Sequence, residues 1–257
     1  MLTSRRVRTV LLAVGLLASV ALAGPVIVLD PGHGGSQDGA ASPSGALEKN
    51  VALTVSRKVK AQLEKDLKAT VVLTRDSDAL VHLSERVTAA NKRKPDLFIS
   101  IHLNSMPTRK QQLLNDGIET YFLSASASGE EARKVAAREN AEVGSAPKGA
   151  SGDTLSFILA DLQRSETHAD SSRLAYAVHE ALIAQTGATD RGVQQAPFYV
   201  LMGLEAPAVL VEVGFISHPD EAKKLADAAY QDKVAQAISA GVQKFLSQVD
   251  ARDGKKE

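Results

Sequence analysis

The sequence contains no cysteine and no tryptophan, and aromatic residues make up only 4% of its 257 residues. Without cysteine, the chain forms neither disulfides nor thiolate metal sites, and a cysteine nucleophile is excluded. Scarce aromatic side chains leave little surface on which nucleic-acid bases could stack. A broad positive charge is also absent, since 30 basic residues balance 30 acidic ones. We therefore expect no nucleic-acid partner.

Two common catalytic motifs are missing as well. The glycine-rich loop near residue 33 lacks the Gly-Lys-Ser/Thr of a P-loop, and no Gly-x-Ser-x-Gly nucleophile elbow occurs. What the chain does have is an ordinary globular composition, with 44% hydrophobic and 23% charged residues. Its length allows one large domain with an ample core.

The first 23 residues have the pattern of an export signal. Three arginines precede an apolar stretch at residues 10–20, and the Ala-Leu-Ala of residues 21–23 has the form of a cleavage site. A retained membrane anchor is the alternative, because residues 9–29 carry no charge, but Gly24-Pro25 interrupts that run. We expect cleavage, after which 27 basic residues face 30 acidic ones. The sequence thus predicts an exported protein, periplasmic or secreted, without stable membrane insertion after cleavage.

The remaining pattern predicts a single α/β domain at residues 24–249, with a twisted, mostly parallel sheet and helices on both faces. Short apolar runs alternate with longer segments of helical period. One long helix is expected at residues 48–67, where Val51, Val55, Val59 and Leu63 form one stripe. Further helices are expected at residues 83–92 and 230–249. Strands are expected at residues 25–29, 70–73, 97–101, 118–123 and 208–213, with a short extended piece at residues 198–201.

A helical insertion near the active site is expected at about residues 124–190. No strand signal occurs between the fourth strand and residue 198, and helices are predicted at residues 130–142, 153–163 and 171–185. Residues 250–257 are expected to form a flexible tail.

Ionisable residues fall at or near the ends of the predicted strands. His33 follows the first strand in a glycine-rich loop, and His102 directly follows the third strand. Glu212 lies inside the apolar run of the last strand, where a carboxylate is costly unless a charge, a metal or hydrogen bonds compensate it. Glu48 begins the first long helix, close to the His33 loop. Ligands gather at the carboxyl ends of strands in open α/β sheets, so these residues are candidates for an active site.

Two imidazoles and one carboxylate form a known ligand set for catalytic zinc, with an open position for water. Glu212 would then serve as a general base and afterwards as an acid toward a leaving amine. From the residues alone, His33 and His102 are equally well explained as loop or capping residues. Glu48 is equally well an ordinary first-turn acid favoured by the helix dipole.

Five motifs in one order carry a family resemblance. They are Asp-Pro-Gly-His-Gly-Gly at residues 30–35, Glu-Lys at 48–49, Val-Leu-Thr-Arg at 72–75, Ser-Ile-His at 100–102 and Val-Glu-Val-Gly-Phe-Ile-Ser at 211–217. Together they resemble the zinc-dependent N-acetylmuramoyl-L-alanine amidases of bacterial cell-wall turnover, over roughly residues 26–245. The resemblance implies one Zn²⁺ per chain on His33, Glu48 and His102, with Glu212 as the catalytic carboxylate.

The implied reaction cleaves the amide between the lactyl group of N-acetylmuramic acid and the L-Ala of the stem peptide. Peptidoglycan is therefore the expected substrate, in wall remodelling or daughter-cell separation. Two alternatives stay open: another zinc peptidase acting on wall peptides, and a non-catalytic peptidoglycan-binding module. Of the other polar residues, Asp30 is expected to set the turn, with orientation of a metal ligand as the alternative. Arg75 and Arg86 are expected to be surface or ion-pair residues. The remaining four histidines are expected to be exposed or structural.

The predicted insertion suggests a regulator. Some division-associated members of the resembled family hold a helix across the zinc, with a glutamate in the open position. Residues 136–141, Ala-Ala-Arg-Glu-Asn-Ala, lie in the matching region. We hypothesise that Glu139 is this plug, with Glu130 and Glu131 as secondary candidates, and a solvated charged helix is the alternative. A plug implies an activating protein partner, which the sequence does not identify.

Overall fold

The structure is a computed structural model that describes residues 24–141 and 166–254. The predicted signal at residues 1–23 and the predicted helix at residues 153–163 lie outside the described residues, as do residues 255–257. Among the described residues, no helix is long and apolar enough to cross a membrane.

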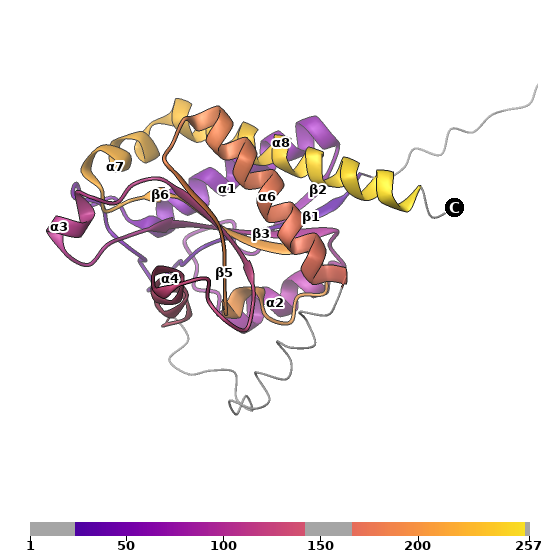
Figure 1. Cartoon of the computed structure of the whole chain (residues 1–257), viewed down its shortest axis with the longest axis horizontal. Helices are drawn as coiled ribbons and strands as arrows, with labels where there is room; N and C mark the ends of the chain where they lie inside the picture. Colours follow the sequence, from indigo (N-terminus) through magenta and orange to yellow (C-terminus); the bar gives the residue numbers. More distant parts are fainter. Residues whose placement is uncertain (1–23, 142–165, 255–257) are drawn as a thin grey trace, which may run out of the picture.

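A six-stranded sheet in the order β2-β1-β3-β6-β4-β5 forms the centre of the chain (Figure 1). Four neighbouring strands, β2, β1, β3 and β6, are mutually parallel. β4 pairs with β6 in the antiparallel direction, and β5 is parallel to β4. The strands are β1 (Val26–Pro31), β2 (Thr70–Leu73), β3 (Leu97–Asn104), β4 (Ile118–Leu123), β5 (Asp190–Ala196) and β6 (Ala208–Phe215).

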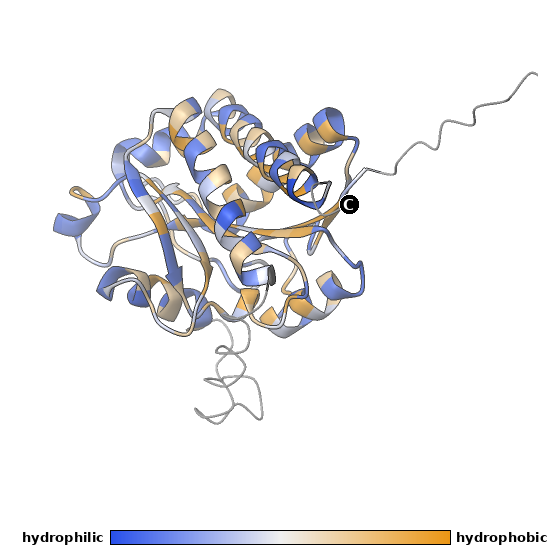
Figure 2. Ribbon diagram, turned by 45° about the vertical axis from the view of Figure 1, so that its right-hand side comes forward, coloured by the Kyte–Doolittle hydropathy of each residue, from blue (hydrophilic) through white to orange (hydrophobic). Residues whose placement is uncertain are grey.

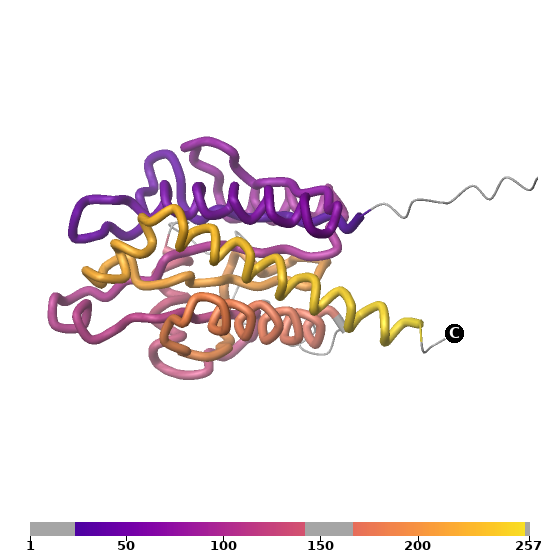
Figure 3. Tube along the Cα trace, turned by 90° about the horizontal axis from the view of Figure 1, so that it is seen from above, coloured from indigo at the N-terminus to yellow at the C-terminus, as the bar shows by residue number. Residues whose placement is uncertain are grey.

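Helices cover both faces of this sheet, which confirms the predicted fold class. Helices α1, α8 and α6 lie side by side over one face (Figure 3), and α2, α4 and η2 cover the other (Figure 1). The helices are α1 (Glu48–Leu67), α2 (Leu83–Asn91), α3 (Arg109–Gln112), α4 (Glu130–Asn140), α6 (Glu166–Thr186), the 3₁₀ helix η2 (Tyr199–Leu201), α7 (Pro219–Ala226) and α8 (Ala228–Asp253).

The central strands are buried on both faces, as their continuous apolar runs require. In β1, Ile27 and Leu29 face the layer of α1, α6 and α8, whereas Val28 faces α2. The central strands are accordingly mostly orange in Figure 2, and the helices alternate between blue and orange faces. The predicted stripe of α1 is confirmed, since Val51, Val55, Val59 and Leu63 are all buried in this core.

One strand was not predicted from the sequence. β5 has the sequence Asp-Arg-Gly-Val-Gln-Gln-Ala, which lacks the apolar alternation of a strand, because β5 is an edge strand with mostly half-exposed residues. The expected extended piece at residues 198–201 is instead mainly the 3₁₀ helix η2. At the other end of the chain, α8 continues to Asp253, into the segment predicted as a tail.

The two described helices of the 124–190 segment have different surroundings. α6 packs against α8 and β4 as part of the main helical layer. α4 lies on the opposite face, next to the carboxyl ends of β3 and β6. Only α4 is therefore positioned to act on a site at those strand ends.

Strand direction and register bring candidate residues to one edge of the sheet. The carboxyl ends of β1, β3 and β6 meet there, with His102 of β3 paired with Glu212 of β6. β4 enters this edge from the opposite direction, so its second residue, Glu119, pairs with Glu212 from the other side.

Close contact between α6 and α8 depends on Gly241. A Cβ added at Gly241 would lie 2.5 Å from Cα of Val178 and 2.8 Å from the carbonyl oxygen of Ala177. We expect Gly241→Ala to lower the free energy of unfolding by about 1–3 kcal/mol through overpacking, although glycine to alanine inside a helix normally stabilises by about 1 kcal/mol. Ser247→Ala, on the exposed side of α8, is the matched control. Urea denaturation measures both, and equal stability of the two variants would contradict the close approach.

Candidate active site

The loop that follows β1 allows an imidazole and a carboxylate to approach the backbone closely. His33 has φ 59°, a left-handed conformation that residues other than glycine rarely adopt. A Cβ at Gly32 would lie 2.5–2.7 Å from ring atoms of His102. Gly39, at φ +68°, likewise leaves room for Glu48, because a Cβ there would lie 2.7 Å from Oε2 of Glu48. Glycine at positions 32 and 39 is therefore a steric requirement of the site.

Two buried arginines hold the His33 loop by its carbonyl oxygens. Arg86 donates hydrogen bonds to the carbonyls of Pro31 and His33, both at 2.7 Å. Arg75 donates to the carbonyls of Pro31 at 3.0 Å and Gly32 at 2.6 Å. The sequence predicts surface or ion-pair roles for both arginines. Neither lies on the surface, since Arg75 is 4% and Arg86 1% exposed. The ion-pair role is confirmed for Arg86, which pairs with Asp30 at 2.8 Å.

Asp30 fixes the Arg86 guanidinium in place. Its Oδ1 accepts from Nη1 of Arg86 at 2.8 Å, and the hydroxyls of Thr74 and Ser100 also donate to the carboxylate. Burial raises the pKa of Asp30, but the charge of Arg86 and these hydrogen bonds outweigh it and hold the pKa below its usual value. Asp30 therefore stays ionised and acts on His33 through Arg86, rather than only setting the turn.

Glu48 is held by backbone groups from two different segments. It is the first residue of α1, and its Oε1 accepts from the backbone N–H of Leu103 and its Oε2 from that of Ala40, both at 2.8 Å. Burial raises the pKa of this carboxyl, but the charge of His33 and hydrogen bonds from both histidines outweigh burial and lower it to about 2. Glu48 is thus an ionised carboxylate with one oxygen turned to the histidines.

Four side chains converge into one buried cluster of nitrogen and oxygen atoms. His33, Glu48, His102 and Glu139 each contribute an atom, and these atoms all lie within 4.8 Å of one another. Oε1 of Glu48 lies 3.0 Å from Nε2 of His33 and 3.3 Å from Nδ1 of His102. Oε2 of Glu139 lies 3.4 Å and 2.9 Å from the same two nitrogens. Both imidazoles therefore face both carboxylates.

The two carboxylates favour protonated imidazole when no metal is bound. Burial lowers the pKa of His102, but the negative charge of Glu139 outweighs burial and raises it to about 10. Burial raises the pKa of Glu139, and the charge of His102 reverses this and holds it well below the usual value. The negative charge of these carboxylates thus favours a cation between them, and a metal bound there would displace a proton from His102.

Glu212 lies beside this cluster and is tied to it by Arg138. Nη2 of Arg138 is 3.4 Å from Oε1 of Glu212, and its Nε donates to Oε1 of Glu139 at 2.8 Å. Burial raises the pKa of Glu212 well above the usual value, and the negative charge of Glu139 raises it further despite Arg138. A raised pKa suits a carboxylate that must take up and return a proton.

The buried polar atoms of the cluster fit a metal ion. Among the described residues, Nδ1 of His102, Oε2 of Glu139 and Oε2 of Glu212 are buried without a hydrogen-bond partner of normal geometry. Native proteins rarely leave such atoms unpaired, and an ion is one of the usual reasons. Two imidazole nitrogens and a carboxylate oxygen are the donor set of catalytic zinc sites. The residues present therefore fit a zinc ion, as well as other divalent ions that accept this donor set.

A second buried carboxylate network behind Glu212 was not predicted from the sequence. Glu119 accepts from Nδ2 of Asn104 at 2.8 Å, from the hydroxyl of Tyr121 at 2.6 Å and from Nε of Arg191 at 2.6 Å. Oδ1 of Asn104 in turn accepts from Arg138. Glu119 stands in an apolar strand just as Glu212 does, so the signal that pointed to Glu212 could also have found Glu119.

The other candidates of the sequence lie away from the cluster. His82 and His218 stand at the N-terminal caps of α2 and α7, and His179 bonds Thr120 and Asp190. These positions agree with the structural roles expected for them. Glu130 and Glu131, the secondary plug candidates, are exposed on α4 and pair with Arg133 and Lys134 of the same helix.

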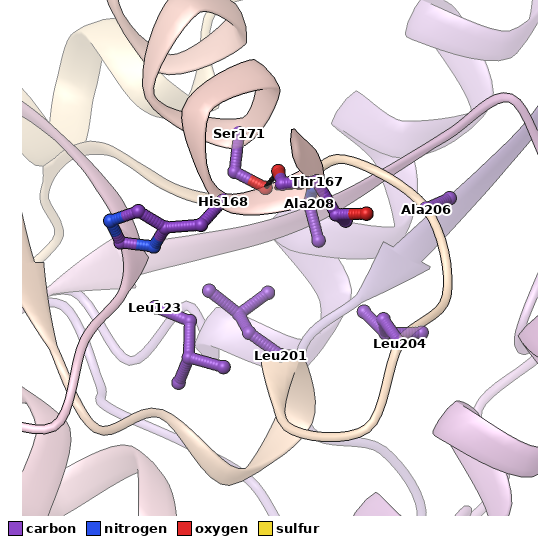
Figure 4. Close-up of a pocket in the computed structure, with 8 residues that line it drawn as sticks. All are labelled: Leu123, Thr167, His168, Ser171, Leu201, Leu204, Ala206 and Ala208. Carbon is purple, nitrogen blue, oxygen red and sulfur yellow. Dashed lines mark hydrogen bonds between the residues drawn. The ribbon is translucent and has the colours of Figure 1, made fainter. Parts of the chain in front are cut away.

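Two cavities differ in what they can hold. One of about 330 Å³ lies between α4 and the loop that follows β3, and its lining includes Met106, Pro107, Val135 and Arg138. The cavity in Figure 4 lies at the other end of β6, between Leu123, Leu201 and Ala208, and its volume is about 20 Å³. That volume holds a single water at most. The larger of these two cavities is thus lined by Arg138, which contacts both Glu139 and Glu212.

Comparison with known proteins agrees with this geometry. The family model described as N-acetylmuramoyl-L-alanine amidase matches residues 27–244, a range that includes the cluster and Glu212. The chain belongs to the N-acetylmuramoyl-L-alanine amidase family. The amidase AmiC of Escherichia coli is 35% identical over 226 residues, which are 86% of this chain and 53% of AmiC. The chain thus spans about half the length of this relative.

Solved structures of the same family show the same fold. An N-acetylmuramoyl-L-alanine amidase from Clostridium difficile 630 superposes with a TM-score of 0.68 at 26% identity, over 88% of this chain and 98% of that one. The CwlD amidase from Clostridioides difficile, in complex with the GerS lipoprotein, gives a TM-score of 0.64 at 26% identity over 87% and 98% of the two chains. These structures cover nearly all described elements of this amidase-family chain.

The arginine contacts with the His33 loop predict an effect on metal affinity. Arg86→Lys keeps a positive charge beside Asp30. The lysine side chain lacks the planar guanidinium that bonds the carbonyls of Pro31 and His33 at the same time. We expect the affinity for Zn²⁺, titrated against a competing chelator, to fall about 10–100-fold, as for other groups that orient metal ligands. Arg173→Lys, on the surface of α6, is the matched control. Unchanged affinity in a folded Arg86→Lys protein would show that the loop holds His33 without this contact.

Proposed function

We propose that this chain is a zinc-dependent N-acetylmuramoyl-L-alanine amidase, with one Zn²⁺ held by His33, Glu48 and His102. The proposed reaction hydrolyses the amide between N-acetylmuramic acid and L-alanine in peptidoglycan. The convergence of these three side chains beside the buried carboxylate of Glu212 is the observation that carries the proposal. Membership of the amidase family supports both the identity of the cleaved amide bond and peptidoglycan as the substrate.

Glu212 moves the proton in this mechanism. A zinc ion in the site supplies a Lewis acid next to the scissile amide. An oxygen of the Glu212 carboxylate takes a proton from the attacking water and later returns it to the leaving nitrogen of L-alanine. Burial of Glu212 in β6 raises its pKa, which makes it basic enough for the first step. The arginine-held loop keeps the His33 ring in its orientation throughout.

The described arrangement also supports an inhibited state, with Glu139 as the plug. Oε2 of Glu139 faces both imidazoles, in a place where the substrate or water would otherwise reach the metal. Its neighbour Arg138 lies against Glu212, so the same turn of α4 engages both the ligands and the proposed base. We infer that α4 must withdraw before catalysis, and that a protein activator brings this about. The CwlD neighbour, solved with a lipoprotein partner, is consistent with such regulation.

We place this reaction outside the cytoplasm, because peptidoglycan lies there and residues 1–23 have the pattern of an export signal. In this proposal, the signal is removed and the amidase acts in the periplasm or after secretion.

Digestion of purified peptidoglycan tests the proposed reaction. Without an activator, we expect a low basal release of stem peptides that begin at L-alanine, a loss of this release after chelation of the metal, and its recovery when Zn²⁺ is added back. Glu212→Ala should reduce release about 100-fold or more, as expected for removal of a general base. Glu64→Ala, on the exposed side of α1, is the matched control. Truncated stem peptides that remain attached to the glycan would instead indicate a wall peptidase. Sedimentation of the protein with peptidoglycan, without release of stem peptides, would indicate a binding module.

Substitution of Glu139 tests the plug. Glu139→Ala should raise basal release about tenfold, because it removes the side chain that faces both imidazoles. Glu131→Ala, an exposed glutamate on the same helix, should leave release unchanged. If Glu139 is instead a permanent ligand of the metal, Glu139→Ala will lower both release and Zn²⁺ affinity.

A further inference from the structure

Helix α4 is attached to the rest of the chain by little apolar contact. Its buried apolar residues are Ala132, Val135 and Ala136, all of them small, so they remove little surface from water. A hollow of about 450 Å³ lies against the first residues of the helix, and another of about 330 Å³ lies along Glu131, Val135 and Arg138. The position of α4 therefore depends strongly on its polar contacts.

Those polar contacts come from three consecutive residues at the end of the helix. Arg138 and Glu139 contact the candidate active site itself. Asn140 contacts a different segment: its Nδ2 donates to the carbonyl of Pro197 and its Oδ1 accepts from the backbone N–H of Tyr199, both at 2.8 Å. The side-chain amide of Asn140 thus makes two hydrogen bonds, one as donor and one as acceptor, with the backbone of residues 197–199.

The segment that receives Asn140 is firmly anchored. Phe198, between the two bonded residues, is 0% exposed, and its ring contacts that of Tyr121 edge to face at a centroid distance of 5.0 Å. Tyr121 is itself bonded to the buried Glu119. Asn140 therefore connects a lightly packed helix to a rigid part of the core.

We propose that Asn140 is the latch that keeps Glu139 in the metal site. The proposal deepens the regulation proposed above and rests on Glu139 being a plug. Asn140 contacts neither the imidazoles nor Glu212, yet it fixes the turn of α4 that carries Glu139. Release of this amide lets α4 move away while the ligands and the base stay intact. An activator that competes for the backbone of Pro197 and Tyr199 would have the same effect.

A second asparagine provides a matched control. Asn91 ends α2 as Asn140 ends α4, and its amide also bonds backbone on both sides, donating to Gly203 at 2.7 Å and accepting from Glu205 at 3.2 Å. Both asparagines are half-buried and hold the stretch between β5 and β6. Asn91 lies on a helix without a plug residue, so its loss removes equivalent bonds with no effect on Glu139.

The experiment compares wild type, Asn140→Ala, Asn91→Ala and Glu139→Ala in the full chain. Hydrogen exchange of the α4 amides is measured on metal-free protein, and stem-peptide release on zinc-loaded protein. Loss of two hydrogen bonds should speed exchange in α4 about tenfold in Asn140→Ala. Release should rise by a similar factor, because the open fraction rises equally. Asn91→Ala should change neither quantity.

Each outcome decides the proposal. Unchanged exchange in α4 of Asn140→Ala overturns the latch, whatever the activity. Release that rises in Glu139→Ala but not in Asn140→Ala overturns the latch and leaves the plug standing. If exchange in α4 is faster only in Asn140→Ala, Asn140 fixes the position of the helix. If no variant releases stem peptides in that case, the proposed amidase function has failed. A merely structural role for Asn140 lowers release together with thermal stability, which also overturns the latch.

Discussion

Negative charge buried at one edge of the sheet is the constraint on which this structure depends. Glu48, Glu139 and Glu212 are each less than 5% exposed, and Glu119 lies behind them in the next strand. Buried carboxylates are tolerated only when positive charge and hydrogen bonds compensate them. Here the two imidazoles, Arg138 and Arg191 provide that compensation.

A cation bound between the histidines changes this balance. When the imidazoles become metal ligands they give up their protons, and the metal takes over their positive charge. The carboxylates would then face positive charge in both states, from protonated imidazoles without a metal and from the cation when a metal is bound. Without a metal, the described arrangement is held together by the ion pairs among these side chains.

The scaffold around this charge is firmly bonded at His33 and lightly packed at the helix that carries Glu139. His33 adopts a backbone conformation that costs about 1–3 kcal/mol, and it is kept there by buried guanidinium groups bonded to the loop carbonyls. α4, in contrast, has a small apolar face and two hollows beside it. This difference in packing separates a firmly held part of the site from a lightly packed one.

The parts of the fold that depend on local pattern could be predicted from the amino-acid sequence. The apolar stripe of α1 and the continuous apolar runs of the central strands were predictable, and α1, β2 and β4 have the predicted bounds. Those runs, with the motifs shared with the amidase family, also pointed to His33, Glu48, His102 and Glu212.

Other features depend on the tertiary structure and could not be predicted from local pattern. β5 is polar, and it is a strand only because β4 pairs with it. The contacts of Arg86 with the His33 loop and of Asn140 with Tyr199 join residues more than fifty positions apart. Such contacts leave no periodic signal, because the strand order that brings them together is fixed only when the whole sheet forms.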